Sequence, residues 1–294
     1  MTIQFTNWDG HSIPGMYNDM PEREYHSLQS MCSATQLKML RNGSPLHVHH
    51  WLSAKQDTPA LRVGRAMHHL VLQPTSYNQF FAVAPNVDRR TKVGKEAFAS
   101  FEQTTTASQT VLTAVESDLV HDMAAAVRQH HTANELLTSG YAEITVISEC
   151  FGGAACRGRV DMLHEDGTIV DLKTTATLAS PQDMQHVVWK HGYGLQMAFY
   201  RELMRCCGIE PPRVVIVAVE KKPPYGVACF ELLPELLDLH LPMVNRLVAE
   251  WRDTIGQNRF TGWSEHVHPL TLPKWAMDEL EIEAEMAATT GGVV

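Results

Sequence analysis

The sequence predicts an α/β protein in which a mixed α+β core sheet is flanked by helices and preceded by a helical region. The hydrophobic period changes from helical to strand-like near residue 139. β-Prone runs at 142–150, 155–163 and 168–172 are separated by short turn segments. A continuous apolar run at 213–220 has the length and β-branched composition of a strand buried on both faces. These observations favour a core sheet in the second half of the chain.

The first half of the chain divides into an irregular segment, 1–30, and a mainly helical segment, 31–138. Ser33 and Gln36 have the spacing of a capping box, which predicts a helix that ends at Asn42-Gly43. Pro45 suits the first position of a second helix. Further helices are predicted over 62–72, 95–103 and 111–138.

The segment 139–277 is predicted to hold the catalytic sheet and its helices. The first strands should form an antiparallel meander, followed by one or two helices over 181–207. The apolar strand 213–220 should pair antiparallel with 225–230, and 234–253 should be helical. An acidic helix is expected over 274–286, and 287–294 reads as a frayed tail. We expect residues 1–294 to form a single domain.

The net charge of −9 argues against a protein that binds nucleic acid non-specifically over its whole surface, because such proteins are usually basic. A nucleic acid would therefore have to meet a local basic patch. The chain contains no apolar run long enough for a membrane helix, so we expect no membrane association. The first residues lack the basic and apolar regions of a signal peptide, which predicts a cytoplasmic location. The cysteines form no Cys-x-x-Cys motif, and we expect them to be reduced thiols.

The most informative segment is the hairpin formed by residues 161–173. Side chains alternate along a strand, so Asp171 and Lys173 should project from one face while Leu172 enters the core. The hairpin can bring Asp161 close to that face. Two carboxylates near a lysine suit Mg²⁺ or Mn²⁺ together with a phosphate. The alternative is an exposed hairpin that carries ordinary surface charges.

The order and spacing of several segments resemble the PD-(D/E)xK nucleases, and within them the exodeoxyribonuclease VIII (RecE-type) branch, which is related to lambda exonuclease and RecB. Asp161 followed by Asp171-Leu172-Lys173 resembles the motif itself, although Val160 stands where the pattern has proline. The other matching segments, which extend the resemblance from about residue 14 to about 277, are 16–26, Gly64–His68, 88–95, Glu143 and Gln196–Tyr200.

This resemblance implies a PD-(D/E)xK nuclease-like core and a site for Mg²⁺ or Mn²⁺. The implied metal ligands are the side chains of His68, Glu143, Asp161 and Asp171 and the backbone carbonyl of Leu172. Lys173 would orient the attacking water and offset charge on the phosphate. Gln196 and Tyr200 share one helix face and would hold a phosphate or orient Lys173.

Each of these residues also has an ordinary structural interpretation. A lone histidine such as His68 is more often packed or exposed than bound to metal, and only one of His68 and His69 can face the site. Glu143 could lie on a solvated strand face, and Tyr200 could belong to the core side of an amphipathic helix. Gly64 would let a metal or backbone approach closely, because it lacks a side chain.

Two basic groups are candidates for contacts with DNA. Arg89, Arg90, Lys92 and Lys95 resemble a mobile basic loop, and Arg157 and Arg159 directly precede Asp161. As phosphate contacts they would make binding depend on salt. The alternative for the first group is a solvated run of charges.

The resemblance implies a metal-dependent double-strand DNA exonuclease that degrades the 5′-ended strand. Its partners would be DNA ends and a single-strand annealing recombinase that receives the 3′ strand. It would assemble into a ring-like homo-oligomer. Two alternatives stay open, namely an endonuclease or single-strand nuclease of the same fold, and a catalytically silent DNA-binding or assembly subunit.

Overall fold

A computed structural model describes residues 3–11, 13–54 and 57–290. The chain divides into two compact units, Met1–Phe260 and Thr261–Val294, where a single domain was expected. The first unit contains a six-stranded mixed sheet flanked by helices, which confirms the predicted fold class. The second unit contains one helix, α12 (Lys274–Thr290), so the predicted tail is helical to Thr290 and otherwise lies outside the described residues.

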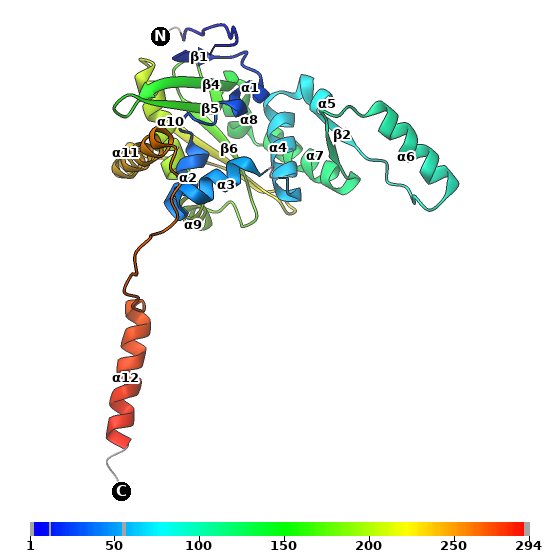
Figure 1. Ribbon diagram of the computed structural model, residues 1–294. Coiled ribbons are helices and arrows are strands. Elements are labelled where there is room, and N and C mark those ends of the chain that lie inside the picture. The colour runs from blue at the N-terminus through cyan, green and yellow to red at the C-terminus, as the bar shows by residue number, and fades with distance from the viewer. Residues whose placement is uncertain (1–2, 12, 55–56, 291–294) are drawn as a thin grey trace. The chain divides into compact units, whose positions relative to one another are not determined.

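The central sheet has the strand order β1-β4-β5-β6-β7-β8 (Figure 1). The predicted antiparallel meander is confirmed as β4 paired with β5 and β5 paired with β6. β7 then lies parallel to β6, and β8 pairs antiparallel with β7. The strand bounds are β1 (Gly15–Tyr17), β4 (Tyr141–Cys150), β5 (Ala154–Leu163), β6 (Ile169–Thr175), β7 (Val214–Glu220) and β8 (Val227–Glu231).

Helices cover both faces of this sheet (Figure 1). One face carries α2 (Ala34–Asn42), α10 (Tyr193–Cys206) and α11 (Pro234–Gln257). The other carries α4 (Pro59–Leu72), α7 (Ala114–Gln129) and α8 (His131–Thr138). β7 contributes buried residues to both cores, which fits its continuous apolar sequence.

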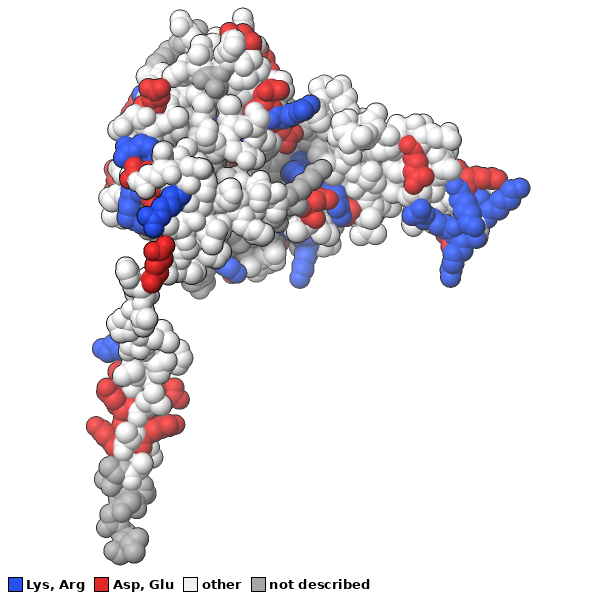
Figure 2. Space-filling view, in the orientation of Figure 1, with Lys and Arg blue, Asp and Glu red and all other residues white. Residues whose placement is uncertain are grey.

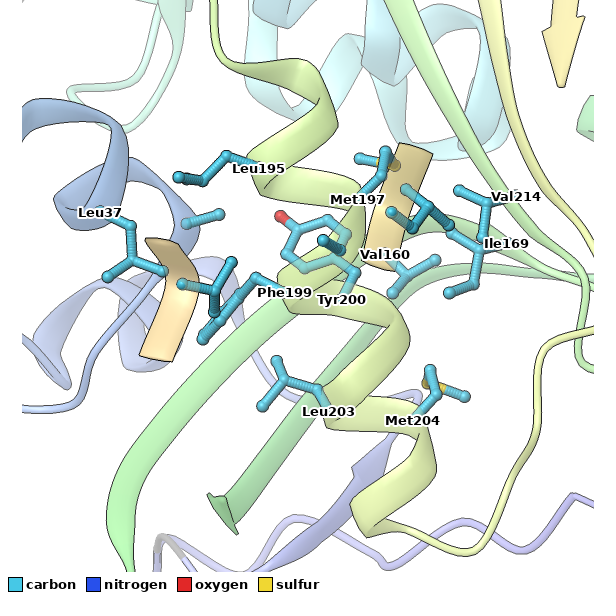
Figure 3. Close-up of a cluster of buried hydrophobic side chains, with 14 of the residues drawn as sticks. Leu37, Val160, Ile169, Leu195, Met197, Phe199, Tyr200, Leu203, Met204 and Val214 are labelled. Carbon is cyan, nitrogen blue, oxygen red and sulfur yellow. The ribbon is translucent and has the colours of Figure 1, made fainter. Parts of the chain in front are cut away.

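The contact between α10 and the sheet is close because β5 has a glycine beneath the helix. The α10 side chains Phe199, Tyr200 and Leu203 join the core that includes Val160 (Figure 3). A Cβ at Gly158 would come within 2.7 Å of Leu203 and 3.1 Å of Tyr200. The absent side chain therefore lets α10, which carries Gln196 and Tyr200, lie directly on the site-bearing strands.

A projecting arm interrupts the helical half of the first unit (Figure 1). It consists of a short parallel pair, β2 (Phe81–Val83) with β3 (Thr110–Leu112), and the helix α6 (Lys92–Thr104) between them. The helix predicted over 111–138 is therefore wrong at its start, since β3 occupies 110–112 and α7 and α8 follow. The smaller helical elements are α1 (Glu22–Ser27), α3 (Pro45–Ser53), η1 (Pro74–Ser76), α5 (Tyr77–Phe80) and α9 (Pro181–Lys190).

Helix capping was predicted in part. The Ser33 hydroxyl accepts from the Gln36 N–H, which confirms Ser33 as the N-cap of α2. The Gln36 side chain instead donates to the Gln29 carbonyl, so the reciprocal half of the box is missing there. A complete capping box occurs at Thr113 and Glu116, where α7 begins.

The cysteines differ from the expectation of uniformly reduced thiols. Cys150 and Cys206 are joined by a disulfide between β4 and α10. Cys32, Cys156, Cys207 and Cys229 are free. None of the described helices has both the length and the apolarity needed to cross a bilayer.

Candidate active site

Asp161 and Asp171 face each other where the β5–β6 ladder ends. The last paired residues are Met162 with Val170, so one further step places Asp161 opposite Asp171. The strands are joined there by a side chain, because Asp161 Oδ2 accepts a hydrogen bond from the Leu172 N–H at 2.7 Å. The predicted convergence of the two carboxylates across the hairpin is thus present in the structure.

At this point of β4 and β5, side chains no longer alternate regularly between the two faces of the sheet. Val160 and Leu163 belong to the same core although they are three residues apart, and so do Tyr141 and Ile144. The pairs that flank Glu143 in the ladder place it opposite Asp161, and its backbone has a φ of 56°. A positive φ is uncommon for a residue other than glycine. The irregularity therefore coincides with a pair of opposed carboxyl groups.

Burial and mutual repulsion disfavour the charged forms of these acids. Burial, with the Asp161 charge, raises the pKa of Glu143 to about 8. Burial also raises the pKa of Asp171 to about 6, against the opposing attraction of Lys173. Asp171 is only 1% exposed. An added cation at this point would relieve the repulsion.

Lys173 lies on the same strand as Asp171 and forms an ion pair with Asp171 Oδ2. Leu172, between them, is fully buried in the core on the opposite face, as predicted. Burial lowers the pKa of the Lys173 ammonium, but the charges of Asp171 and Asp161 outweigh that effect and raise it. Lys173 is therefore held as a cation beside the carboxylates.

His68 reaches the same centre from α4. Its Nδ1 lies 3.5 Å from Asp161 Oδ2, and its ring also interacts with the Leu172 carbonyl. Burial lowers the pKa of His68, which favours the neutral imidazole that a metal needs. His69 instead contacts the Ser76 hydroxyl and lines the adjoining cleft, so of the two histidines His68 is the one that lies against Asp161. A Cβ at Gly64 would meet no protein atom within 4 Å, so no backbone approaches closely there, and the approach of a metal stays a prediction.

Gln196 holds Asp171 rather than Lys173. Its Nε2 donates to Asp171 Oδ1 at 3.0 Å, and its Oε1 accepts from Lys38 Nζ at 2.7 Å. Lys38 lies on α2 and was missed in the sequence, where a lysine inside an amphipathic helix gives no signal. Burial and the nearby Lys173 lower the pKa of Lys38 to about 8.

Tyr200 is mainly a core residue at the edge of the site. It is 7% exposed and packs among the apolar residues of α10 (Figure 3). Burial raises the pKa of its hydroxyl well above the ordinary value, while an interaction with Gln196 lowers it slightly. The packed ring confirms the core interpretation of Tyr200, and its role in holding a phosphate stays a prediction.

A cleft of about 1440 Å³ opens beside these residues. His68, Glu143 and Asp161 line it, whereas Asp171 is more deeply buried. Its remaining walls come from segments that are distant in sequence, which include Asn18–Glu22, the 174–177 loop and residues 186–193 of α9 and α10. An elongated substrate could therefore contact several elements at once.

The donor set fits a hard divalent cation, although no closed cage exists. Carboxylate and carbonyl oxygens with one imidazole suit Mg²⁺ or Mn²⁺. Asp171 Oδ2 is buried and its partner is the Lys173 ammonium, a charge that a bound cation would have to share or displace. Within the described ranges, however, no three His, Cys, Asp or Glu side chains already surround a metal position.

The basic residues of the arm lie apart from this centre. Figure 2 shows basic side chains gathered at the tip of the arm, which carries the start of α6. Arg89 stacks on Phe98, Arg90 pairs with Asp88, and Lys92 lies 3.9 Å from Glu96. Surface ion pairs of this kind are weak, so the charges remain available to a phosphate backbone.

Arg157 and Arg159 have different positions from those expected of DNA contacts. Arg157 is 4% exposed, donates to the Tyr25 carbonyl and stacks on the Tyr25 ring. From this buried position it does not reach a phosphate, so we assign it a structural role instead of the predicted DNA contact. Arg159 is half-buried, donates to Thr145 and the Met20 carbonyl, and lines the cleft.

Comparisons with known proteins agree with this architecture. The model of a family described as a PDDEXK-like domain of unknown function (DUF3799) matches residues 33–269. A crystal structure named "Putative exonuclease" from Eubacterium rectale is 17% identical, with a TM-score of 0.61 over 89% of this chain and 98% of that chain. At that identity the likeness shows the fold alone.

Weaker structural matches add no argument. The structure of LHK-Exo in complex with dAMP is 15% identical with a TM-score of 0.27, over 68% of this chain and 94% of that chain. The SSO0001 structure is 14% identical with a TM-score of 0.28, over 79% and 88% of the two chains. The search of curated proteins found no match.

Proposed function

Because the chain belongs to the PDDEXK-like domain family (DUF3799), we propose that it is a metal-dependent deoxyribonuclease. The more specific proposal is a double-strand DNA exonuclease that degrades the 5′-ended strand. The observation that supports a metal-dependent nuclease is the meeting of Asp161, Asp171 and Lys173 at the open end of the β5–β6 ladder, beside the large cleft. The choice of duplex ends and of the 5′-ended strand rests on the resemblance of the sequence motifs.

The residues of this centre have separable roles. Asp161 and Asp171 would hold Mg²⁺ or Mn²⁺, with the Leu172 carbonyl, His68 and Glu143 as further candidate ligands. The cation, when bound, would supply Lewis-acid stabilisation of charge on the phosphate. Lys173 would orient the attacking water and share the negative charge, and Gln196 would keep Asp171 in one orientation.

The cleft and the arm support binding of an extended nucleic acid. Arg159 inside the cleft and the basic residues at the tip of the arm would contact phosphates at two separate places. Local contacts of this kind reconcile DNA binding with a net charge of −9. A 3′ single strand would be the product, suited to an annealing recombinase, and a ring-like homo-oligomer would keep the enzyme on its DNA.

End-labelled linear duplex and covalently closed circular DNA of equal length test this proposal. With Mg²⁺ or Mn²⁺ the linear duplex should be degraded from its 5′ ends and the circle should survive, because an exonuclease needs an end. EDTA and Asp171→Asn should each abolish degradation. Cleavage of the circle would support an endonuclease, and preference for single strands a single-strand nuclease. DNA binding without metal-dependent cleavage would support a silent DNA-binding or assembly subunit.

A further inference from the structure

We propose that Lys38 is a positioning residue of this centre, which fixes the Gln196 amide and through it the carboxylate of Asp171. The proposal rests on the proposed function in one respect, namely that Asp171 is a metal ligand. It adds a residue of the N-terminal helical region to a site otherwise built by the sheet and by α4 and α10.

The Gln196 side chain is held at both ends of its amide. A lysine ammonium can only donate hydrogen bonds, and an ionised carboxylate can only accept them. Lys38 Nζ, 2.7 Å from Oε1, therefore leaves Nε2 to face Asp171 Oδ1 at 3.0 Å. Without the ammonium, Oε1 would lose its donor and the amide would be held only through Nε2. Lys38 thus anchors the far end of the amide and so fixes the approach of Nε2 to Asp171.

The position of Lys38 is otherwise unfavourable for a charge. No carboxylate in the described part of the chain pairs with Lys38 within 4.0 Å, although Lys173 pairs with Asp171. The two ammonium groups lie 5.7 Å and 5.2 Å from the centroid of the same ring, Tyr193. Burial lowers the pKa of Lys38, and the charge of Lys173 disfavours a second ammonium at this position and lowers that pKa further. If Lys38 contributed packing alone, an uncharged side chain of equal length could replace it without loss of Mn²⁺ binding.

Metal affinity separates the positioning role from a purely electrostatic one, because the two predict opposite signs. If Lys38 only adds positive charge near the metal, Lys38→Met removes a repulsion and tightens Mn²⁺ binding. If Lys38 positions Asp171, the same change weakens binding, as losses of residues that orient metal ligands typically do by about 10- to 100-fold. The measurement needs no DNA and no cleavage.

Isothermal titration of the metal-free protein with Mn²⁺ should be carried out on wild type, Lys38→Met, Gln196→Met and the double variant. We expect each single variant to bind about tenfold more weakly, and the double variant to bind no more weakly than Gln196→Met, because both changes remove one chain of contacts. Lys222→Met, which removes an exposed lysine outside the cleft, should bind as wild type does.

Amide NMR supplies a readout that does not depend on metal. The Gln196 side-chain NH₂ signal, identified by its loss in Gln196→Met, should shift and lose its protection in Lys38→Met while the backbone spectrum persists. If Lys38→Met fails to fold, Lys38→Arg replaces it and should retain the protected signal. Unchanged or tighter Mn²⁺ binding by Lys38→Met, or an unmoved Gln196 signal, would overturn the positioning role. Wild-type protein that binds Mn²⁺ but leaves DNA intact would overturn the proposed function alone, and wild type without Mn²⁺ binding would overturn both.

Discussion

Glu143 lies directly opposite Asp161 across the antiparallel β4–β5 pair, at the residue where the β4 backbone has a φ of 56°. Opposed like charges destabilise a sheet. The pair is tolerable when one carboxyl holds a proton or when a cation lies between them. This relationship makes the stability of the protein depend on both pH and metal.

The first prediction concerns pH in the absence of metal. Folding raises the pKa of Glu143 to about 8 from an ordinary value near 4.5, so the folded state binds the extra proton. Its stabilising effect is present at low pH and is lost as pH rises through about 8. In EDTA the melting temperature should therefore fall between pH 6 and 8.5, and Glu143→Gln should flatten this fall. A slope that Glu143→Gln leaves unchanged would contradict the assignment.

Metal should reverse this trend. A divalent cation that binds the folded carboxylates, but not the unfolded chain, raises the melting temperature with the logarithm of its concentration once that concentration exceeds Kd. The rise caused by Mn²⁺ should be larger at pH 8 than at pH 6, since protons compete at the lower value. Thermal scans at matched ionic strength measure this rise in melting temperature, with metal-free buffer as the reference. Equal Mn²⁺ shifts for wild type and Asp171→Asn would place the metal elsewhere.

Lys173→Met should separate chemistry from folding. The ammonium contributes electrostatic stabilisation of the reacting phosphate, and removal of one such group costs roughly 100- to 1000-fold in rate. Mn²⁺ affinity should be kept or should increase, because Asp171 loses the ammonium that now neutralises it. Single-turnover cleavage and calorimetry measure the two effects. Lys222→Met is the matched control, and a cleavage rate that survives in Lys173→Met would remove Lys173 from the mechanism.

The basic tip of the arm should set the salt dependence of DNA binding. Replacing Arg89 and Arg90 with glutamine should lower the slope of log K against log salt by roughly one unit per lost phosphate contact. Arg213→Gln, on an exposed arginine paired with Glu231, provides the control. Binding should be measured with Ca²⁺ to limit cleavage. Identical slopes for the arm variant and the control would exclude the arm from the interface.

Arg157 should affect stability and leave DNA binding largely unchanged. Its buried guanidinium holds the N-terminal segment through the Tyr25 carbonyl and ring, and hydrogen bonds to charged groups contribute roughly 1.5–3 kcal/mol. Arg157→Met should lower the free energy of unfolding by about that amount in urea titrations. The salt slope of DNA binding should match wild type. A stable variant with a reduced salt slope would restore Arg157 as a DNA contact.

Sequence patterns predicted the parts of the fold that depend on near neighbours. The meander, the Ser33 cap and the shared face of Asp171 and Lys173 arise from alternation, turns and capping within a few residues. β3 was missed because it is three residues long and its partner β2 lies across α6 in the chain. Three residues are too few to show the two-residue hydrophobic alternation by which a strand is recognised in a sequence.

The parts of the site that escaped prediction depend on distant contacts. Lys38 reaches Gln196 across 158 residues, and no local pattern around Lys38 indicates that partner. Arg157 looked available because it follows the alternation of charged residues before Asp161. Its burial is imposed by Tyr25, 132 residues earlier in the chain. The charge of a residue thus indicates which groups it can bind. It does not indicate whether the side chain is exposed to solvent or already bonded inside the protein.

The hydrogen bond from the Leu172 N–H to Asp161 Oδ2 gives one carboxylate two tasks. The carboxylate accepts a hydrogen bond that a backbone carbonyl would otherwise accept at the end of the hairpin. Its other oxygen is free to serve as a ligand in the proposed site. An Asp161→Ala variant would therefore loosen the end of the β5–β6 ladder while it removes a candidate ligand, and inactivity alone would not reveal which loss mattered. Asp161→Asn keeps an acceptor for this hydrogen bond and removes only the charge. For trapping a complex with uncleaved DNA, asparagine rather than alanine is the substitution that leaves the scaffold intact.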